Sequence, residues 1–569
     1  MAEPDPLSPC IVGTARRTWH PEDLGDSQAP EPLAMWEEVA REACADALEG
    51  ATAGRSDLAR SIESLQVVYC HSWQYDDPVA RLASRIGARP GHGYYSGIGG
   101  STPQVLLNAT AERMLAGEMD LALVVGGEAL ATKRRLGKAG ERPGWSFPPS
   151  EPRPFPWEAP FHPAELAHEV LQAWLTFAIF DSARRGHLGT PLGDHRRHLG
   201  ELMASLSSVA AENPFAWFRD PRSAEEITTP SMSNRYVASP YTKLMTAIMD
   251  VDMAAGVLVS THRLAEDLGV PRDRRVYLHG WAYAEDSPYV AERPDLWRSV
   301  AMSEAHQTAL RNAGIGIDDV GHLDLYACFA SSVDFARDAL GIVDGDMRPL
   351  SVTGGLPYHG GPGSNPVTHA IATMVEVLRQ DPGSFGLVTG VGMHMSKHSA
   401  AVYSTDPPTR MSPHGGEDLQ ARVDRVPGPC LLEHHQGSAR VLAASAVHAH
   451  SGEPAWGLLV CEIPGDATGG AGPGLHAGEA SASRVHAGEA SGIHAGEASA
   501  LTRGTADRGA LPARCYARTF DPAMLAAMED DGGMGLVGST VELRTLALDD
   551  SHASASAPAG TMVNVAHLA

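Results

Sequence analysis

The sequence predicts an α/β protein in which two similar halves are followed by a smaller, β-rich C-terminal domain. Three observations predict this class. Short apolar runs alternate with segments of helical periodicity up to about residue 405, which is typical of a mostly parallel sheet with helices on both faces. The alternation occurs on both sides of a loop-rich stretch, which indicates an internal duplication. Beyond about residue 410, strand-like runs predominate.

The apolar spacing gives the expected elements in chain order. Met35, Val39, Ala43 and Leu48, for example, fall on one helical face. In the first half we expect strands at 10–13, 64–70 and 120–126, and helices at 35–48 and 103–115. After the loop-rich stretch we expect a helix at 253–268, and in the second half helices at 300–313, 333–340 and 366–379 and strands at 275–280, 322–326, 386–389 and 400–404.

Composition divides the chain further. Residues 131–232 are rich in Pro, Trp, His and Arg and predict an inserted loop domain with helices at 164–185 and 199–213. We expect a first half at 1–270 that includes this loop domain, a second half at 271–408, a small domain at 409–550 and a frayed tail at 551–569. Strands are expected at 440–448, 454–463, 513–519 and 538–546, with a helix at 522–530. A glycine-rich insert at 465–510 repeats HAGEA from His476, His486 and His494 and predicts disorder rather than a metal site.

Charge and cysteine content exclude several classes of protein. The formal net charge of −25 argues against general nucleic-acid binding, because the chain would repel phosphates. The seven cysteines are scattered without a CxxC pair, so neither a disulfide framework nor a zinc site is expected. The sequence shows no signal-like start and no apolar run long enough for a membrane span, which favours the cytoplasm.

Four segments in the same order resemble those of the thiolase superfamily. They are GGSTPQVLLNATAERMLAGEMDLALVVGGEAL, SNRYVASPYTKLMTAIMDVDMAAGVLVST, DLYACFASS and SVTGGLPYHGGPGSNPVTHAIATMVEVLR, and the match covers about residues 8–405. The resemblance is closest to the sterol-carrier type and its actinobacterial thiolase-like relatives. It implies a thiolase fold of two duplicated βαβαβαββ halves in α-β-α-β-α layers. It also implies acetyl-CoA acetyltransferase-like activity on coenzyme A thioesters, in lipid metabolism, and an OB-like fold for residues 409–550.

The resemblance also shows where this chain departs from the family pattern. Gly99 stands at the position of the nucleophilic cysteine, and Thr389 stands near that of the acid/base cysteine. Gly361 replaces the histidine of the Gly-His-Pro loop, and Tyr326 replaces the asparagine or histidine of another loop. A thiolase needs a thiolate at a helix N-terminus, so cleavage through an acyl-cysteine is disfavoured.

Other side chains could serve in their place. Tyr326 could donate a hydrogen bond to a carbonyl or enolate oxygen, or exchange a proton if its pKa is lowered; alternatively, it is a buried aromatic that ends a strand. His359 could enter the site or be a packing residue. Ser101 and Thr102 are expected as helix N-cap groups, and Cys328 as a packing residue.

The backbone of the glycine-rich turns is the second candidate for ligand binding. Glycine lets the main chain approach a ligand closely, so amides of these turns could hold a thioester oxygen. The candidate positions are Gly99, Gly100, Gly360, Gly361, Gly390 and Gly392.

Two functions remain open from the sequence. The first is carbon–carbon bond making or breaking on acyl-CoA without an acyl-cysteine, as in aldolases of the superfamily, with Tyr326 helped by Tyr241 or Tyr358. The second is a non-catalytic module that binds acyl-CoA, a sterol or lipid, or a partner protein. Coenzyme A thioester is the expected substrate or ligand, with no covalently bound cofactor and no metal. A homodimer is expected by resemblance, and a monomer is the alternative.

Overall fold

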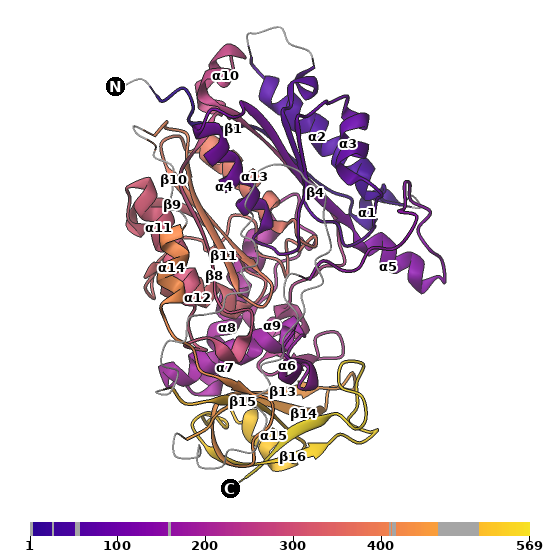
Figure 1. Ribbon diagram of the computed structural model, residues 1–569, viewed down its shortest axis with the longest axis vertical. Helices are drawn as coiled ribbons and strands as arrows, with labels where there is room; N and C mark the ends of the chain where they lie inside the picture. Colours follow the sequence, from indigo (N-terminus) through magenta and orange to yellow (C-terminus); the bar gives the residue numbers. More distant parts are fainter. Residues whose placement is uncertain are drawn as a thin grey trace.

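The computed structural model describes residues 4–25, 28–51, 57–157, 161–408, 411, 417–464 and 511–568. Its strands form one nine-stranded and one eight-stranded sheet. Figure 1 shows the nine-stranded sheet with its helices in the upper part, the helices of the loop domain below it, and the C-terminal strands at the bottom.

The first half supplies five strands of the large sheet. They are β1 (Pro9–Thr18), β2 (Ser64–Val67), β3 (His92–Tyr95), β4 (Leu121–Ala129) and β7 (Asp252–Thr261). Its helices are α1 (Pro21–Leu24), α2 (Pro32–Leu48), α3 (Pro78–Ile86), α4 (Thr102–Leu115) and α10 (His262–Asp267), with a 3₁₀ turn at Leu58–Ser61.

The second half supplies the other four strands. They are β8 (Val276–Glu285), β9 (Val320–Asp324), β10 (Phe385–Gly392) and β11 (Lys397–Ser404). Its helices are α11 (Val300–Ala313), α12 (Ala330–Leu340) and α13 (Pro366–Gln380), with 3₁₀ turns at Arg272–Arg274, Val290–Glu292 and Ile317–Asp319.

The two halves repeat one arrangement, which confirms the expected duplication and the thiolase fold. The sheet order is β3-β2-β4-β7-β1-β8-β11-β10-β9, so the halves meet at the antiparallel pair β1–β8. Outward from this seam, two antiparallel neighbours are followed by a parallel pair in each half, β4 with β2 and β10 with β9. Helices α4 and α13 contact each other and strands of both halves, whereas α2 packs on the first half and α11 on the second. These contacts give the expected five layers.

One element of the first half differs in kind from the expectation. The helix predicted at 253–268, where the alternation resumes after the loop domain, is wrong: the strand β7 (Asp252–Thr261) occupies most of this range, and only α10 follows. Every residue of β7 is buried, between β1 and β4 in the centre of the sheet. A strand covered on both faces reads as a continuous apolar run and does not alternate, so its periodicity cannot be told from that of a buried helix.

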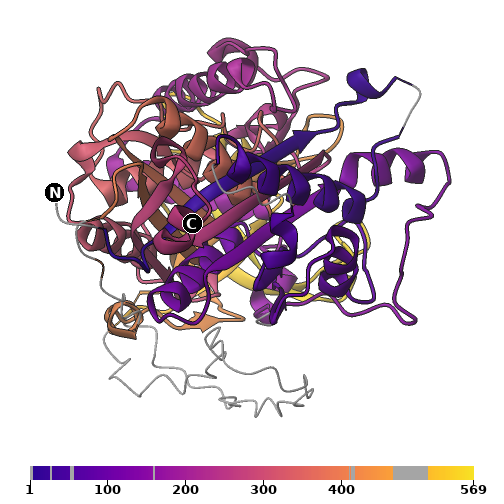
Figure 2. The same ribbon diagram turned by 90° about the horizontal axis from the view of Figure 1, so that it is seen from above.

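The loop domain between β4 and β7 contains mostly helices. It comprises α5 (Leu130–Lys138), α6 (Pro163–Ala167), α7 (Ala173–Leu188), α8 (Leu192–Glu212), α9 (Ala224–Thr228), β5 (Tyr236–Ala238), β6 (Tyr241–Thr242) and a 3₁₀ turn at Lys243–Met245. The helix expected at 164–185 is therefore two helices, which are separated at 168–172. Seen from above in Figure 2, the purple segment that contains α5 extends away from the body of the molecule.

The C-terminal domain is a small closed barrel. It comprises β12 (Leu431–Leu432), β13 (Gly437–His448), β14 (Pro454–Glu462), β15 (Arg514–Thr519), α15 (Pro522–Met528), β16 (Thr540–Ala547) and β17 (Met562–Leu568). The helix α14 (Glu417–Asp424) precedes the barrel in the chain and packs on α11 and β8 of the second half. The pairs β13–β14, β14–β15, β15–β17, β17–β16 and β16–β13 close a ring, in which only β15–β17 is parallel. The expected small barrel is confirmed, and the repeat insert at 465–510 lies outside the described residues.

The expected frayed tail at 551–569 is wrong, because β17 completes the barrel. Asn564 on β17 is fully buried, and its side chain donates to the carbonyl oxygen of Tyr516 over 2.8 Å. The composition of 551–560 is small and polar, as a tail would be, but the apolar alternation in MVNVAHL pairs with β16 along its whole length.

The barrel is fixed to the rest of the molecule by buried polar contacts. The Tyr516 hydroxyl accepts a hydrogen bond from the Ala291 amide and lies 3.3 Å from Glu165 of α6. The Arg514 guanidinium donates to backbone carbonyls that include Arg293, and Arg518 donates to the carbonyl of Ala167. Because these groups are buried, the contacts fix the barrel to both the loop domain and the second half.

Candidate functional site

The turn at Gly99–Ser101, directly before α4, is a place where the two halves meet closely. A Cβ built on Gly100 would lie 1.9 Å from the Tyr326 hydroxyl oxygen and 2.6 Å from the Val391 carbonyl oxygen. Gly99 adopts a φ of +135°, and a Cβ there would lie 3.5 Å from Cα of Gly392. Only glycine allows this contact, since a side chain at residue 100 would displace the tyrosine.

Tyr326 is held at this turn by its own backbone. Its amide donates to the Thr389 hydroxyl over 2.8 Å, and its carbonyl accepts from the Ser332 hydroxyl over 2.8 Å. The side chain is 8% exposed, and burial raises the pKa of Tyr326 well above its ordinary value. The phenol therefore keeps its proton, which fits a hydrogen-bond donor and not the lowered pKa that proton exchange requires.

The glycines of β10 allow the N-terminus of α4 to pack closely against this strand. A Cβ on Gly390 would lie 2.5 Å from the Ser399 hydroxyl and 3.0 Å from Cα of Ser101, and one on Gly392 would lie 2.8 Å from the Ser101 hydroxyl. Both glycines belong to the ladder with β11. Their proximity to the turn therefore follows from close packing between a helix N-terminus and a strand.

The expected residues of the Gly-His-Pro-like loop pack against a different surface. The Gly361 amide donates to the Ile248 carbonyl over 2.8 Å, so it is engaged within the protein and is not a free oxyanion donor. A Cβ on Gly360 would lie 2.8 Å from the Met253 sulfur. His359 is buried, its ring centroid lies 5.4 Å from that of His369, and burial lowers the pKa of His359 to about 4. His359 is thus a packed, neutral imidazole.

Ser364 links the same loop to the Gly99 turn, a residue that the sequence did not single out. Its hydroxyl accepts a hydrogen bond from the Gly99 amide over 3.1 Å and lies 3.0 Å from Nε2 of His71. His71 directly follows the buried segment of β2, and Ser364 lies two residues before α13. Because 293 positions separate the two, no local spacing could have predicted the pair.

Glu128, at the end of β4, fixes the loop that carries His71. Its carboxylate accepts hydrogen bonds from the His71 amide over 2.7 Å, the Ser72 amide over 2.8 Å and the Ser72 hydroxyl over 2.6 Å. Burial raises the pKa of Glu128 to about 7, and these hydrogen bonds oppose the rise. A Cβ on Gly363 would lie 2.3 Å from the same carboxylate, so the loop before α13 also packs on it.

Aromatic side chains cover His71. The His71 ring lies 5.8 Å from Phe155 and 5.0 Å from Tyr69, between ring centroids, and Phe155 lies 4.5 Å from Trp157. Phe155 and Trp157 are 39% and 51% exposed. Burial also lowers the pKa of His71 to about 4, so this imidazole is neutral at pH 7.

The remaining candidates are structural. The Cys328 thiol is buried against the Ser332 hydroxyl, and burial raises its pKa to about 12. Ser101 is the N-cap residue of α4, but its side chain makes no cap hydrogen bond to the described backbone. No group of three or more metal-ligating side chains occurs in the described part of the chain. None of the described helices is long and apolar enough to cross a membrane.

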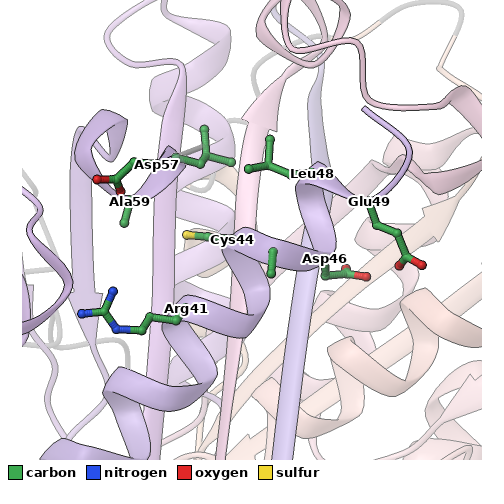
Figure 3. Close-up of a pocket in the computed structure, with 9 residues that line it drawn as sticks. Arg41, Cys44, Asp46, Leu48, Glu49, Asp57 and Ala59 are labelled. Carbon is green, nitrogen blue, oxygen red and sulfur yellow. The ribbon is translucent and has the colours of Figure 1, made fainter. Parts of the chain in front are cut away.

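A hollow lies apart from this site, along α2. It has a volume of about 670 Å³ and is lined by Arg41, Cys44, Glu49 and Asp57 among others. Figure 3 shows the Cys44 sulfur between the side chains of Arg41 and Leu48. Burial raises the pKa of the Cys44 thiol to about 12, so it is not a ready nucleophile.

The duplicated five-layer fold, with the N-termini of α4 and α13 meeting between its halves, is that of the thiolase superfamily, and the chain belongs to this superfamily. It is similar along its whole length to a monomeric SCP2-thiolase-like protein type 1 from Mycobacterium smegmatis. The two chains are 28% identical with a TM-score of 0.76, and all of each chain is covered. An Ltp2-ChsH2(DUF35) aldolase shares the fold, at 17% identity and a TM-score of 0.54 over 71% of this chain and 99% of that one.

Curated relatives match over shorter stretches. The benzoylsuccinyl-CoA thiolase subunit BbsB of Thauera aromatica is 25% identical over 190 residues, which are 31% of this chain and 47% of the relative. Sterol carrier protein 2 of Rattus norvegicus is 25% identical over 186 residues, 32% of this chain and 33% of the relative. The chain thus spans about half or less of the length of these relatives, and no family model matches it.

Proposed function

We propose that the protein binds acyl-CoA thioesters at the Gly99–Ser101 turn and makes or breaks a carbon–carbon bond next to the thioester without an acyl-cysteine. The observation that carries this proposal is the Tyr326 hydroxyl, which lies against Gly100 at the N-terminus of α4. A neutral phenol at this position can donate a hydrogen bond to a thioester or enolate oxygen. The positive end of the α4 dipole favours the same developing negative charge.

The lack of a reactive thiol among the described residues of this site supports this mechanism over thiolysis. Gly99 and Thr389 stand where the family resemblance puts the two cysteines. Cys70 and Cys328 are buried, and burial raises the pKa of each thiol far above its ordinary value. A thiol that stays protonated cannot open a thioester efficiently, because the thiolate is the nucleophile. Relatives named as thiolases and as an aldolase are consistent with acyl-CoA as the substrate class.

The test is Tyr326→Phe, assayed for cleavage or condensation on a panel of acyl-CoA and β-hydroxyacyl-CoA substrates. We expect kcat to fall roughly 100-fold, as when one oxyanion donor is removed, with little change in the Kd for acyl-CoA. Tyr403→Phe is the matched control, since Tyr403 is also buried and donates to Gln104 over 2.6 Å. Wild-type turnover in Tyr326→Phe would refute the role of the phenol.

One observation favours a non-catalytic binding module as the second candidate. The Gly99 amide donates to Ser364 and the Gly361 amide to Ile248, so two of the expected oxyanion donors are engaged within the protein. The expected helper Tyr241 also donates its hydroxyl to Ser331, away from Tyr326. Calorimetry with CoA and a long-chain acyl-CoA, followed by mass spectrometry of the products, separates the two: tight binding with no product would establish the module.

We further propose that the chain is a monomer with an OB-like barrel. The whole-length relative is described as monomeric. The ring order β13-β14-β15-β17-β16, with its single parallel pair β15–β17, supports an OB-like connectivity. Light scattering gives the mass directly. A mass of two chains would refute the monomer and support the homodimer expected from the family.

A further inference from the structure

Ser364 and His71 form a pair that the proposed role of Tyr326 does not use. The Ser364 hydroxyl oxygen is one hydrogen bond from the Gly99 amide, at the position that the family resemblance gives to the nucleophile. The oxygen accepts from Gly99, so its own proton can be donated to Nε2 of His71, 3.0 Å away. This arrangement assigns the imidazole a proton on Nδ1, which leaves Nε2 as the acceptor.

The pair is held from both sides by buried groups. The Glu128 carboxylate fixes the backbone at His71 and Ser72 and packs against Gly363, the residue before the serine. Ser364 is 1% exposed and precedes α13, a helix of 15 residues whose N-terminus lies next to that of α4. A hydroxyl that is hydrogen-bonded to a base is the arrangement of an activated nucleophile, and here Glu128 fixes the backbone of the residue that carries the base.

We propose that Ser364 is a nucleophile activated by His71, and that it accepts the acyl group of a thioester and passes it to water. The Ser364 oxygen forms a bond to the thioester carbonyl carbon while His71 Nε2 takes the hydroxyl proton. The carbon–sulfur bond then breaks, and the proton passes from His71 to the leaving thiolate. Water, deprotonated by the same imidazole, attacks the carbonyl carbon of the acyl-serine. The bond from this carbon to the serine oxygen then breaks, His71 returns the proton to that oxygen, and a carboxylic acid and free Ser364 are released. The net reaction is hydrolysis of the thioester to an acid and a thiol, with no oxidant or reductant.

The two helix N-termini supply the electrostatic part of this reaction. The tetrahedral intermediate carries a negative oxygen, which the positive ends of the α4 and α13 dipoles stabilise. Burial under Tyr69 and Phe155 lowers the pKa of His71, so the imidazole is neutral at pH 7 and Nε2 can accept the serine proton, although it is a weaker base than a free imidazole.

A serine-directed fluorophosphonate tests the nucleophile without coenzyme A. We expect the full-length protein to gain one covalent adduct, which peptide mass spectrometry places on Ser364. Labelling should fall at least 100-fold in Ser364→Ala and in His71→Ala. Ser445→Ala is the matched control, because Ser445 is an equally buried serine that lies on β13 of the barrel, away from this site, and it should label as the wild type does. An adduct on another residue, or no adduct, overturns the proposal.

The second experiment follows the reaction itself. Thiol release from acetyl-CoA and from p-nitrophenyl thioacetate should occur in the wild-type protein and be lost in Ser364→Ala. Ser364→Cys keeps a nucleophile of similar size and should retain acylation, which excludes misfolding as the cause of the loss. If Ser364→Ala hydrolyses both thioesters at the wild-type rate, the serine is not the nucleophile.

The choice of thioester rests on the proposed function, and the two can fail separately. Release from the small thioester together with no acyl-CoA binding by calorimetry would reject the acyl-CoA assignment and keep the nucleophile. Acyl-CoA binding and Tyr326-dependent turnover, with neither an adduct nor Ser364-dependent release, would reject the nucleophile and keep the proposed function.

Discussion

Helices α4 and α13 occupy equivalent places in the two halves, yet they bring different chemistry to the point where they meet. Each is preceded by a glycine-containing turn, has proline in its first turn and makes no side-chain cap bond to the described backbone. The turn before α4 presents only the backbone of its glycines, and the Tyr326 hydroxyl from the other half packs against Gly100. The turn before α13 offers the Ser364 hydroxyl, which His71 from the other half contacts. Each half thus completes the turn of its partner.

This exchange shows how a duplicated fold can become asymmetric at one site. Duplication gives two similar scaffolds with helix N-termini that face each other, and only a few positions must then differ. Gly100 makes room for a phenol in one turn, and Gly363 makes room for a carboxylate in the other. Substitutions in the two turns should therefore have separable consequences.

Alanine at the two glycines should break the two turns one at a time, and we expect the largest effects here. In Gly363→Ala the Cβ would lie 2.3 Å from the Glu128 carboxylate and 2.6 Å from the His71 ring, at a φ of +56° that disfavours alanine. In Gly100→Ala it would meet the Tyr326 hydroxyl at 1.9 Å. Overpacking of this kind costs about 3 kcal/mol of unfolding free energy. Urea unfolding measures the loss, and assays of the two variants locate it.

The activities should divide between these variants. Gly363→Ala should lose fluorophosphonate labelling of Ser364, and Gly100→Ala should lose Tyr326-dependent turnover. Gly137→Ala is the control: no described atom lies within 4 Å of the new Cβ in α5, so it should be neutral or stabilising by up to about 1 kcal/mol. Loss of both activities in both glycine variants would contradict the separation.

Glu128→Gln should change how stability depends on pH. The pKa of Glu128 is raised from 4.5 to about 7 in the folded protein, so folding favours its protonated form. Its contribution is complete below about pH 4.5 and is lost as pH rises through 7, which amounts to about 3 kcal/mol. Urea unfolding at pH 5 and pH 8 should therefore show a larger decrease for the wild type than for Glu128→Gln.

His71 changes stability with pH in the opposite direction, and it is present in both the wild type and Glu128→Gln. Its pKa falls from 6.5 to about 4 on folding, so its contribution is present above pH 6.5 and is lost as pH falls through 4. The difference between wild type and Glu128→Gln cancels this term and isolates the carboxyl group. Parallel stability profiles from pH 5 to pH 8 would show that Glu128 is ionised in the folded protein throughout.

The sequence predicts the fold better than it predicts the site. Helix α11 has the expected bounds, because its apolar residues follow one face and the helix lies on one side of a sheet. The central strand β7 was predicted wrongly because full burial removes the alternation of buried and exposed residues. The last strand β17 was missed because the residues that precede it are small and polar, as in a disordered tail. Periodicity therefore works where an element has one exposed face.

The site is predictable only where its residues lie in a motif. The order of the glycine-rich segments led to Gly99, Gly100 and Tyr326, which the fold brings into contact. The same motif included Gly361, whose amide binds Ile248. His71 and Ser364 meet through the crossing of the two halves, and neither has a partner nearby in sequence. Contacts of this kind depend on tertiary packing, which a local pattern does not encode.

The N-cap residue of α4 is predicted to contribute less to stability than an ordinary N-cap, and this is the smallest expected effect. Ser299 caps α11: its hydroxyl accepts from the Met302 amide over 2.8 Å, so Ser299→Ala should lower the unfolding free energy by about 1–2 kcal/mol. Ser101 caps no described amide of α4, so Ser101→Ala should change it by less than about 0.5 kcal/mol. Equal losses in urea unfolding would contradict this.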